Sequence, residues 1–117
     1  MLLRNVTRGF VLAERASVAR GLWARGMGLL GRSALPEGEA LILDPCTSIH
    51  MLGMRFAIDA IFVDRAGRCL SVARDLRPWR VGPLVRGTRA VVELPAGAAG
   101  PTTPGDHLSW DAPSPNR

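Results

Sequence analysis

The chain has 117 residues, 47% hydrophobic and 21% charged, so its length suits one folded domain and its composition excludes a disordered protein. The formal net charge is +5, and all 15 basic residues are arginines scattered along the chain. Such a charge attracts polyanions at low salt, but scattered arginines argue against a dedicated nucleic-acid site. The 13 Gly and 9 Pro predict many turns and short elements.

The first segment, Met1 to Ala13, reads as a β-hairpin in which Gly9 supplies the positive φ that its turn requires. Residues 17–30 change to a helical period, which predicts a short amphipathic helix with Ser17 as its N-cap. The apolar stripe of this helix is formed by Ala19, Leu22, Trp23, Gly26, Met27 and Leu30.

The rest of the chain reads as short strands separated by turns. The expected strands are Glu39–Leu43, an extended Cys46–Leu52, Asp59–Val63, Arg68–Val72, Thr88–Leu94 and His107–Trp110. Gly67 suits the turn of the clearest hairpin, which joins Asp59–Val63 to Arg68–Val72. The pattern predicts a mainly-β sandwich or barrel with one short N-terminal helix, in a single globular domain over residues 1–110 and a flexible tail over 111–117.

Two cysteines, Cys46 and Cys69, are too few for a disulfide framework, and their spacing does not predict a structural zinc site. We therefore expect free thiols in the cytoplasm. No apolar run approaches the about 20 residues that span a bilayer, and Phe10–Ala13 is shorter than the about 7–15 residues of a leader core. We predict no membrane insertion, no cofactor and no metal.

The most informative stretch runs from Pro45 to Asp64, because it places ionisable side chains within an apolar run. Cys46, Ser48 and His50 alternate, so in a regular strand they would share one face and suggest a nucleophile with its base. The alternative is a cysteine packed as a small apolar residue and a histidine satisfied by a backbone carbonyl.

Arg55 and Asp59 follow in the same stretch, four residues apart. They could form an ion pair that braces the corner, or Asp59 could orient Arg55 toward an anionic ligand. A His50–Asp59 pair is also open, and with Cys46 it would suggest a triad or a three-ligand metal site, although the spacing fits no known metal motif. A bulge near Gly53 would bring these side chains to one face.

Trp79 lies between Arg77 and Arg80. An exposed tryptophan there would suit a stacked ligand or a binding hot spot, whereas a buried one would plug the end of the barrel.

Several motifs together resemble a bacterial and archaeal family, the domain of unknown function 192. They are Arg25–Arg32, Leu35–Leu41, Cys46–Asp59, Trp79–Val81, Glu93–Gly97 and Pro104–Asp106. The resemblance implies a small mainly-β, jelly-roll-like fold and no known activity or cofactor. The chain departs from the family pattern at Ala57, where proline is usual, and over Ala98–Pro104, which looks shortened.

Two functions remain open from the sequence. The favoured one is a small binding or accessory module with a polar recess for an anionic small molecule or a peptide, formed by His50, Arg55, Asp59 and Trp79. The alternative is a hydrolase that uses Cys46 or Ser48 with His50, and a metal-binding module comes third. No nucleophile elbow, HExxH or P-loop motif is present, which favours binding over catalysis.

Overall fold

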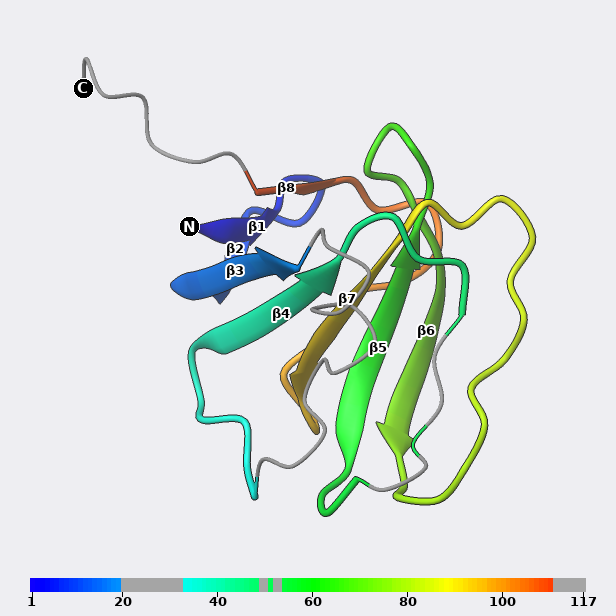
Figure 1. Cartoon of the computed structure of the whole chain (residues 1–117). Helices are drawn as coiled ribbons and strands as arrows, with labels where there is room; N and C mark the ends of the chain where they lie inside the picture. The colour runs from blue at the N-terminus through cyan, green and yellow to red at the C-terminus, as the bar shows by residue number, and fades with distance from the viewer. Residues whose placement is uncertain (20–32, 49–50, 52–53, 111–117) are drawn as a thin grey trace.

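The computed structural model describes residues 1–19, 33–48, 51 and 54–110, and within them the chain forms β-strands and no helix (Figure 1). The strands are β1 (Leu3–Asn5), β2 (Phe10–Ala13), β3 (Arg15–Ala19), β4 (Glu39–Leu43), β5 (Ile58–Val63), β6 (Cys69–Leu76), β7 (Ala90–Pro95) and β8 (Leu108–Ser109). None of the described residues belongs to a helix long and apolar enough to cross a membrane. The predicted tail, 111–117, lies outside the described residues.

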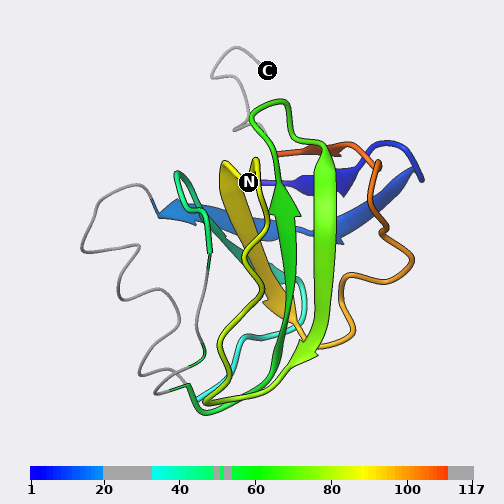
Figure 2. The same cartoon turned by 90° about the vertical axis from the view of Figure 1, so that its right-hand side faces the viewer.

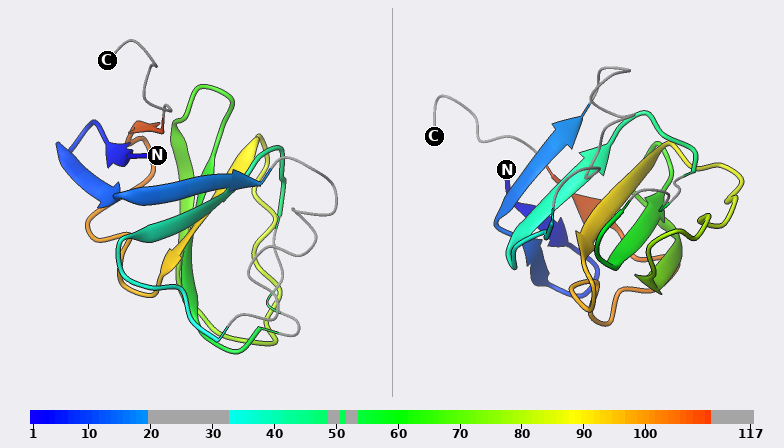
Figure 3. Two further views of the ribbon diagram at one scale, coloured as in Figure 1. Left: turned by 60° about the vertical axis from the view of Figure 1, so that its left-hand side comes forward. Right: turned by 60° about the horizontal axis from the view of Figure 1, so that its bottom comes forward.

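The strands form two open sheets. The small sheet has the order β2-β1-β8 and the large sheet the order β3-β4-β7-β5-β6. The strands of the large sheet lie side by side without closing (Figure 3), and those of the small sheet run crosswise to β5 and β6 (Figure 2). All pairings are antiparallel except β3 with β4.

Each face of the large sheet has its own apolar core, because successive residues of a strand point to opposite faces. In β7, Val92 and Leu94 join the first core, which also contains Leu3 and Leu108 of the small sheet. Val91 joins the second core. Full burial of one such side chain stabilises the fold by about 1.5–3 kcal/mol. The first core therefore holds the two sheets together, and the second packs Leu35, Met51 and Met54 onto the other face of the large sheet.

The two predicted hairpins are confirmed. β1 pairs with β2 around Gly9, whose φ is +72°, and β5 pairs with β6 around Gly67, whose φ is +87°. The predicted strand Glu39–Leu43 coincides with β4. These segments are encoded locally, by short apolar runs that flank a glycine turn.

The predicted N-terminal helix is wrong where the structure describes it. Ser17 is not an N-cap, because Arg15–Ala19 forms β3 and pairs in parallel with β4, with Ser17 opposite Leu41 and Ala19 opposite Leu43. The ladder with β4 satisfies backbone groups that a helix would have satisfied internally, and tertiary pairing overrides a weak local period. The rest of the predicted helix, 20–30, lies outside the described residues.

The predicted barrel or jelly-roll-like sandwich is also corrected. The large sheet ends at β3 on one side and at β6 on the other, so the described strands form two open sheets and no closed barrel.

Candidate functional site

The predicted strand Cys46–Leu52 is not formed over the residues that the structure describes there. The N–H of Cys46 donates to the carbonyl of Arg89 at 2.8 Å, and its thiol donates to the carbonyl of Ser48 at 3.0 Å. His50 and Gly53 lie outside the described residues, so the proposed nucleophile–base pair stays a prediction. The second thiol, Cys69, is buried in β6, and burial raises its pKa to about 11.

Asp59 is buried in β5, with only 1% of its surface exposed. Its Oδ1 accepts the N–H of Asp75 at 2.9 Å, and its Oδ2 accepts the N–H groups of Gly97 and Ala99, each at 3.0 Å. The carboxylate therefore ties β5 to the end of β6 and to the turn after β7. Its partners are backbone groups, which is the arrangement of a residue that holds the scaffold together.

Arg55 does not join Asp59. Its side chain is exposed, and the structure shows no hydrogen bond or ion pair between Arg55 and any described residue. The predicted brace between these two residues is thus not formed.

Trp79 is 69% exposed, so it does not plug the end of a barrel. Its backbone has a φ of +67°, a conformation that is uncommon for residues other than glycine and asparagine. The N–H of Trp79 donates to the carbonyl of Met51 at 2.7 Å, and the N–H of Met51 donates to the carbonyl of Arg80 at 2.6 Å. These two bonds hold the backbone while the indole projects into solvent.

Trp79 belongs to a connection between β6 and β7, Arg77–Arg89, which we call the basic loop. It contains four arginines, and no Asp or Glu occurs from Leu76 to Val92. Besides Trp79, its exposed apolar side chains are Val81 at 73% and Leu84 at 86%.

Two arginines at the ends of the basic loop are paired. Arg77 lies 2.9 Å from Asp75, and Arg89 lies 3.0 Å from Asp44. The two central ones, Arg80 and Arg86, are exposed and have no acidic partner among the described residues. The middle of the loop therefore presents positive charge and apolar surface together.

The basic loop is anchored along the segment that follows β4, and the two run side by side (Figures 1 and 3). The anchors are the Cys46–Arg89 bond at one end and the Met51 bonds at the other. Between them Val85 packs against the second core, and its carbonyl accepts the hydroxyl of Thr88 at 2.7 Å. Val85 thus packs inward, whereas the apolar side chains of Val81 and Leu84 in the same loop are exposed to solvent.

Sequence reasoning missed a second buried carboxyl, Glu93 in β7. It is 6% exposed, and its Oε1 has no hydrogen-bond partner among the residues that the structure describes. Burial raises the pKa of Glu93 to about 7. The signal was available, since Glu93 is the one charged residue within the apolar run Ala90–Leu94.

Asp106 is buried as well but has several partners. Its Oδ2 accepts the amide of Asn5 at 3.0 Å, the guanidinium of Arg8 at 2.6 Å and the N–H of Thr103 at 3.1 Å. The hydrogen bond from Asn5, with those from Arg8 and Thr103, holds the pKa of Asp106 below its usual value. This cluster links the small sheet to the turn before β8.

No three His, Cys, Asp or Glu side chains among the described residues come together as a set that could hold a metal ion.

The chain is similar to proteins without an assigned activity. The family model DUF192, described as "Uncharacterized ACR", matches residues 4–110. A "UPF0127 protein" from Thermococcus sibiricus is 30% identical over 116 residues, which cover 94% of this chain and 75% of that protein.

Two crystal structures share the fold. A protein of unknown function from Novosphingobium aromaticivorans is 28% identical with a TM-score of 0.72, over 81% of this chain and 74% of that one. A candidate transcription regulator from Sinorhizobium meliloti is 20% identical, also with a TM-score of 0.72, over 80% of this chain and 79% of that one. The second likeness concerns the fold alone.

Proposed function

The chain belongs to the DUF192 family of uncharacterised proteins, and from that premise we propose that it is a binding module whose basic loop receives an acidic, partly apolar segment of another protein. The observation that carries the proposal is the exposure of Trp79 and Leu84 around two arginines without acidic partners among the described residues. Tryptophan and arginine dominate the binding energy of protein interfaces.

The conformation of Trp79 supports the proposal. Holding a non-glycine residue at a φ of +67° costs of the order of 1 kcal/mol or more in conformational free energy. Because the indole of Trp79 is 69% exposed, its packing offsets little of this cost. A surface turn selected only for stability would favour glycine or asparagine at this position.

The charge of the loop selects the chemistry of the partner. With four arginines and no acidic residue between Leu76 and Val92, the loop repels basic segments and attracts carboxylates. The three exposed apolar side chains require a partner that also buries apolar groups. A short acidic segment with two or three leucine or phenylalanine side chains meets both conditions.

The four residues of the predicted recess have different roles in this proposal. Trp79 belongs to the proposed binding surface, Asp59 is a scaffold residue, and Arg55 and His50 remain predicted contributors. The proposal puts the protein in the cytoplasm, where the thiols of Cys46 and Cys69 would stay reduced.

The test uses a fluorescein-labelled peptide with four glutamates and three leucines, titrated at 150 mM salt and followed by fluorescence anisotropy. We expect saturable binding that weakens about 30-fold in Trp79→Asn, because loss of a hot-spot tryptophan costs about 2 kcal/mol. Asparagine tolerates positive φ, so this variant removes the indole without straining the backbone. Arg80→Glu with Arg86→Glu should abolish binding.

Matched controls on the small sheet are Arg4→Glu and Val11→Ser, two exposed positions that should leave binding unchanged. A peptide with serines in place of the leucines should bind weakly and lose its affinity between 50 and 200 mM salt. If both peptides bind alike, the attraction is generic and the proposal fails. Trp79-dependent binding to vesicles of anionic lipid, without binding to the peptide, would assign the loop to a membrane surface instead.

A further inference from the structure

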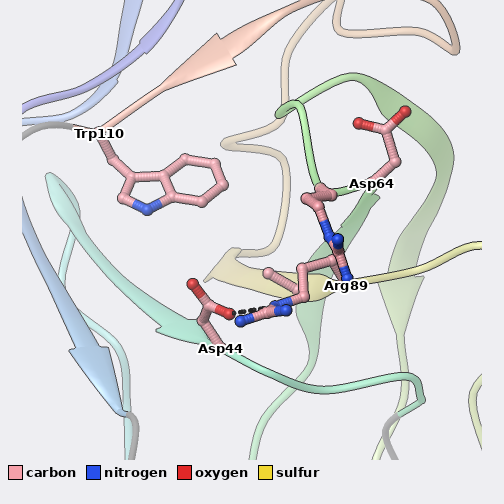
Figure 4. A pocket seen from close by; sticks show the side chains of 6 residues that line it. Asp44, Asp64, Arg89 and Trp110 are labelled. Atoms are coloured by element: carbon pink, nitrogen blue, oxygen red, sulfur yellow. Dashed lines mark hydrogen bonds and ion pairs between the residues drawn. The ribbon is translucent and has the colours of Figure 1, made fainter.

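A concave surface lies at the end of the large sheet, and Trp79 is not among the residues that line it. It is a recess of about 460 Å³ between the end of β4, the start of β7, the β5–β6 turn and the residue after β8 (Figure 4). Its lining residues are Asp44, Asp64, Arg65, Arg89, Ala90 and Trp110. This volume falls in the range of about 300–1,000 Å³ that is usual for small-molecule sites.

The β5–β6 turn forms one wall of the recess and is held in place from several sides. The Oδ1 of Asp64 accepts the N–H groups of Ala66 and Arg68, each at 2.9 Å. The carbonyl of Gly67 accepts the N–H of Leu108 at 2.9 Å, which joins the turn to β8. A Cβ on Gly67 would lie 2.7 Å from the carbonyl oxygen of Leu108, so only glycine allows this close approach. The wall is therefore preorganised, which lowers the entropic cost of binding.

The charges of the recess are not balanced toward its centre. The Nε of Arg89 donates to the Oδ1 of Asp44 at 3.0 Å, which orients the guanidinium and leaves its other N–H groups for a ligand. Asp64 turns its carboxylate into its own turn, away from Trp110 and the Asp44–Arg89 pair (Figure 4). Arg65 is exposed and has no acidic partner among the described residues. The two aspartates formally balance the two arginines, but the carboxylate of Asp64 is taken up by its own turn, which leaves the guanidinium of Arg65 to a ligand.

Trp110 forms the opposite wall. Its side chain is half-buried against the first core, and its ring faces the Asp44–Arg89 pair across the recess (Figure 4). An adjoining recess of about 250 Å³ shares Arg65 and Trp110 and reaches His107. An aromatic wall beside two guanidinium groups offers stacking and anion binding within one site.

We propose that this recess binds a small planar anion, an aromatic ring that carries a carboxylate or a phosphate. The ring stacks on the indole of Trp110, and the anionic group accepts hydrogen bonds from Arg65 and Arg89. The site is independent of the basic loop except for Arg89, whose backbone ends that loop, so the two proposals can fail separately.

The experiment follows ¹H–¹⁵N NMR spectra of the full chain during titration with adenosine monophosphate or benzoate. The three indole signals are assigned with Trp79→Phe and Trp110→Phe. We expect one of the two probes to shift the Trp110 indole signal saturably and to leave that of Trp79 in place. If adenosine monophosphate is the probe that binds, adenosine and inorganic phosphate, each offered alone, should bind at least tenfold more weakly than it does. Benzoate binding without adenosine monophosphate binding would assign the site to carboxylates, and the reverse to phosphates.

The variants separate this site from the basic loop. Arg65→Ala, at an exposed position, and Trp110→Leu should each weaken binding at least tenfold, whereas Trp79→Asn should leave it unchanged. If Trp110→Leu fails to fold, Arg65→Ala decides the matter. The proposal is overturned if neither probe gives a saturable shift up to 10 mM, or if Arg65→Ala binds as the wild type does.

Discussion

Two carboxyl groups are buried on neighbouring strands of the large sheet and have opposite environments. Asp59 in β5 stands opposite Leu94, and Glu93 in β7 stands opposite Ala60, one step away in the register. Because successive residues alternate, Asp59 faces the first core and Glu93 the second. Asp59 is 1% exposed and Glu93 is 6% exposed.

The difference between the two lies in their partners. Asp59 accepts three backbone N–H groups, whereas the Oε1 of Glu93 accepts none from the described part of the chain. A buried carboxylate with several donors holds a structure together, while one without donors favours the neutral acid. Burial alone therefore does not separate a scaffold residue from a proton-sensitive one, and the hydrogen-bond partners do.

The largest expected effect is at Asp59. Asp59→Ala leaves the N–H groups of Asp75, Gly97 and Ala99 without their acceptor, and we expect it to lower the free energy of unfolding by about 3–5 kcal/mol. Urea unfolding measures this loss. Arg55→Ala is the control and should change the stability by less than about 0.5 kcal/mol, since its side chain is exposed. Equal losses in the two variants would show that Asp59 acts through Arg55 after all.

Glu93 should give a smaller effect with a distinctive pH dependence. Its pKa is about 7 in the folded protein against 4.5 ordinarily, so the folded state binds the proton more tightly than the unfolded state. The stability that this proton contributes is complete below pH 4.5 and is lost as the pH rises through 7. The gap between the two pKa values corresponds to about 3 kcal/mol.

Glu93→Gln keeps the shape of the side chain and removes this titration. We expect the variant to be within about 1 kcal/mol of the wild type at pH 4.5 and more stable by up to about 3 kcal/mol at pH 8. Urea unfolding of both proteins at the two pH values provides the comparison. A difference that does not change with pH would mean that Glu93 finds a partner in solution.

Asp106 provides a third buried carboxyl group, whose effect on stability should change at acid pH. Its pKa is lowered, first by the hydrogen bond from Asn5 and then by the bonds from Arg8 and Thr103. The stability it contributes is present above its ordinary pKa of 3.8 and is lost as the pH falls through its lower folded value. The stability difference between wild type and Asp106→Asn should therefore shrink as the pH falls below 3.8. Over the same range the stability difference between wild type and Glu93→Gln should not change with pH. A difference that grows toward acid pH would reverse this assignment.

Most of the strands could be predicted from the sequence. The short apolar runs on either side of Gly9 and Gly67 are local signals, and the resulting hairpins close over a few residues, so neighbouring side chains suffice to specify them. The position of Trp79 between Arg77 and Arg80 is also a local signal, but whether its indole is exposed or buried was left open by the sequence. The arginine content and the absence of acidic residues around it likewise needed no structure.

Long-range pairing decided the rest. Ser17–Ala19 became a strand because β4, more than 20 positions later, offers a parallel ladder that a helical period cannot foresee. Asp59 became a scaffold residue because the turn after β7 brings Gly97 and Ala99 to its carboxylate. The Oε1 of Glu93 finds no donor among the described residues, and its neighbours in the ladder are Leu41 and Ala60. A residue type records which hydrogen bonds a side chain is able to make, but only the packed chain determines which donors lie within reach.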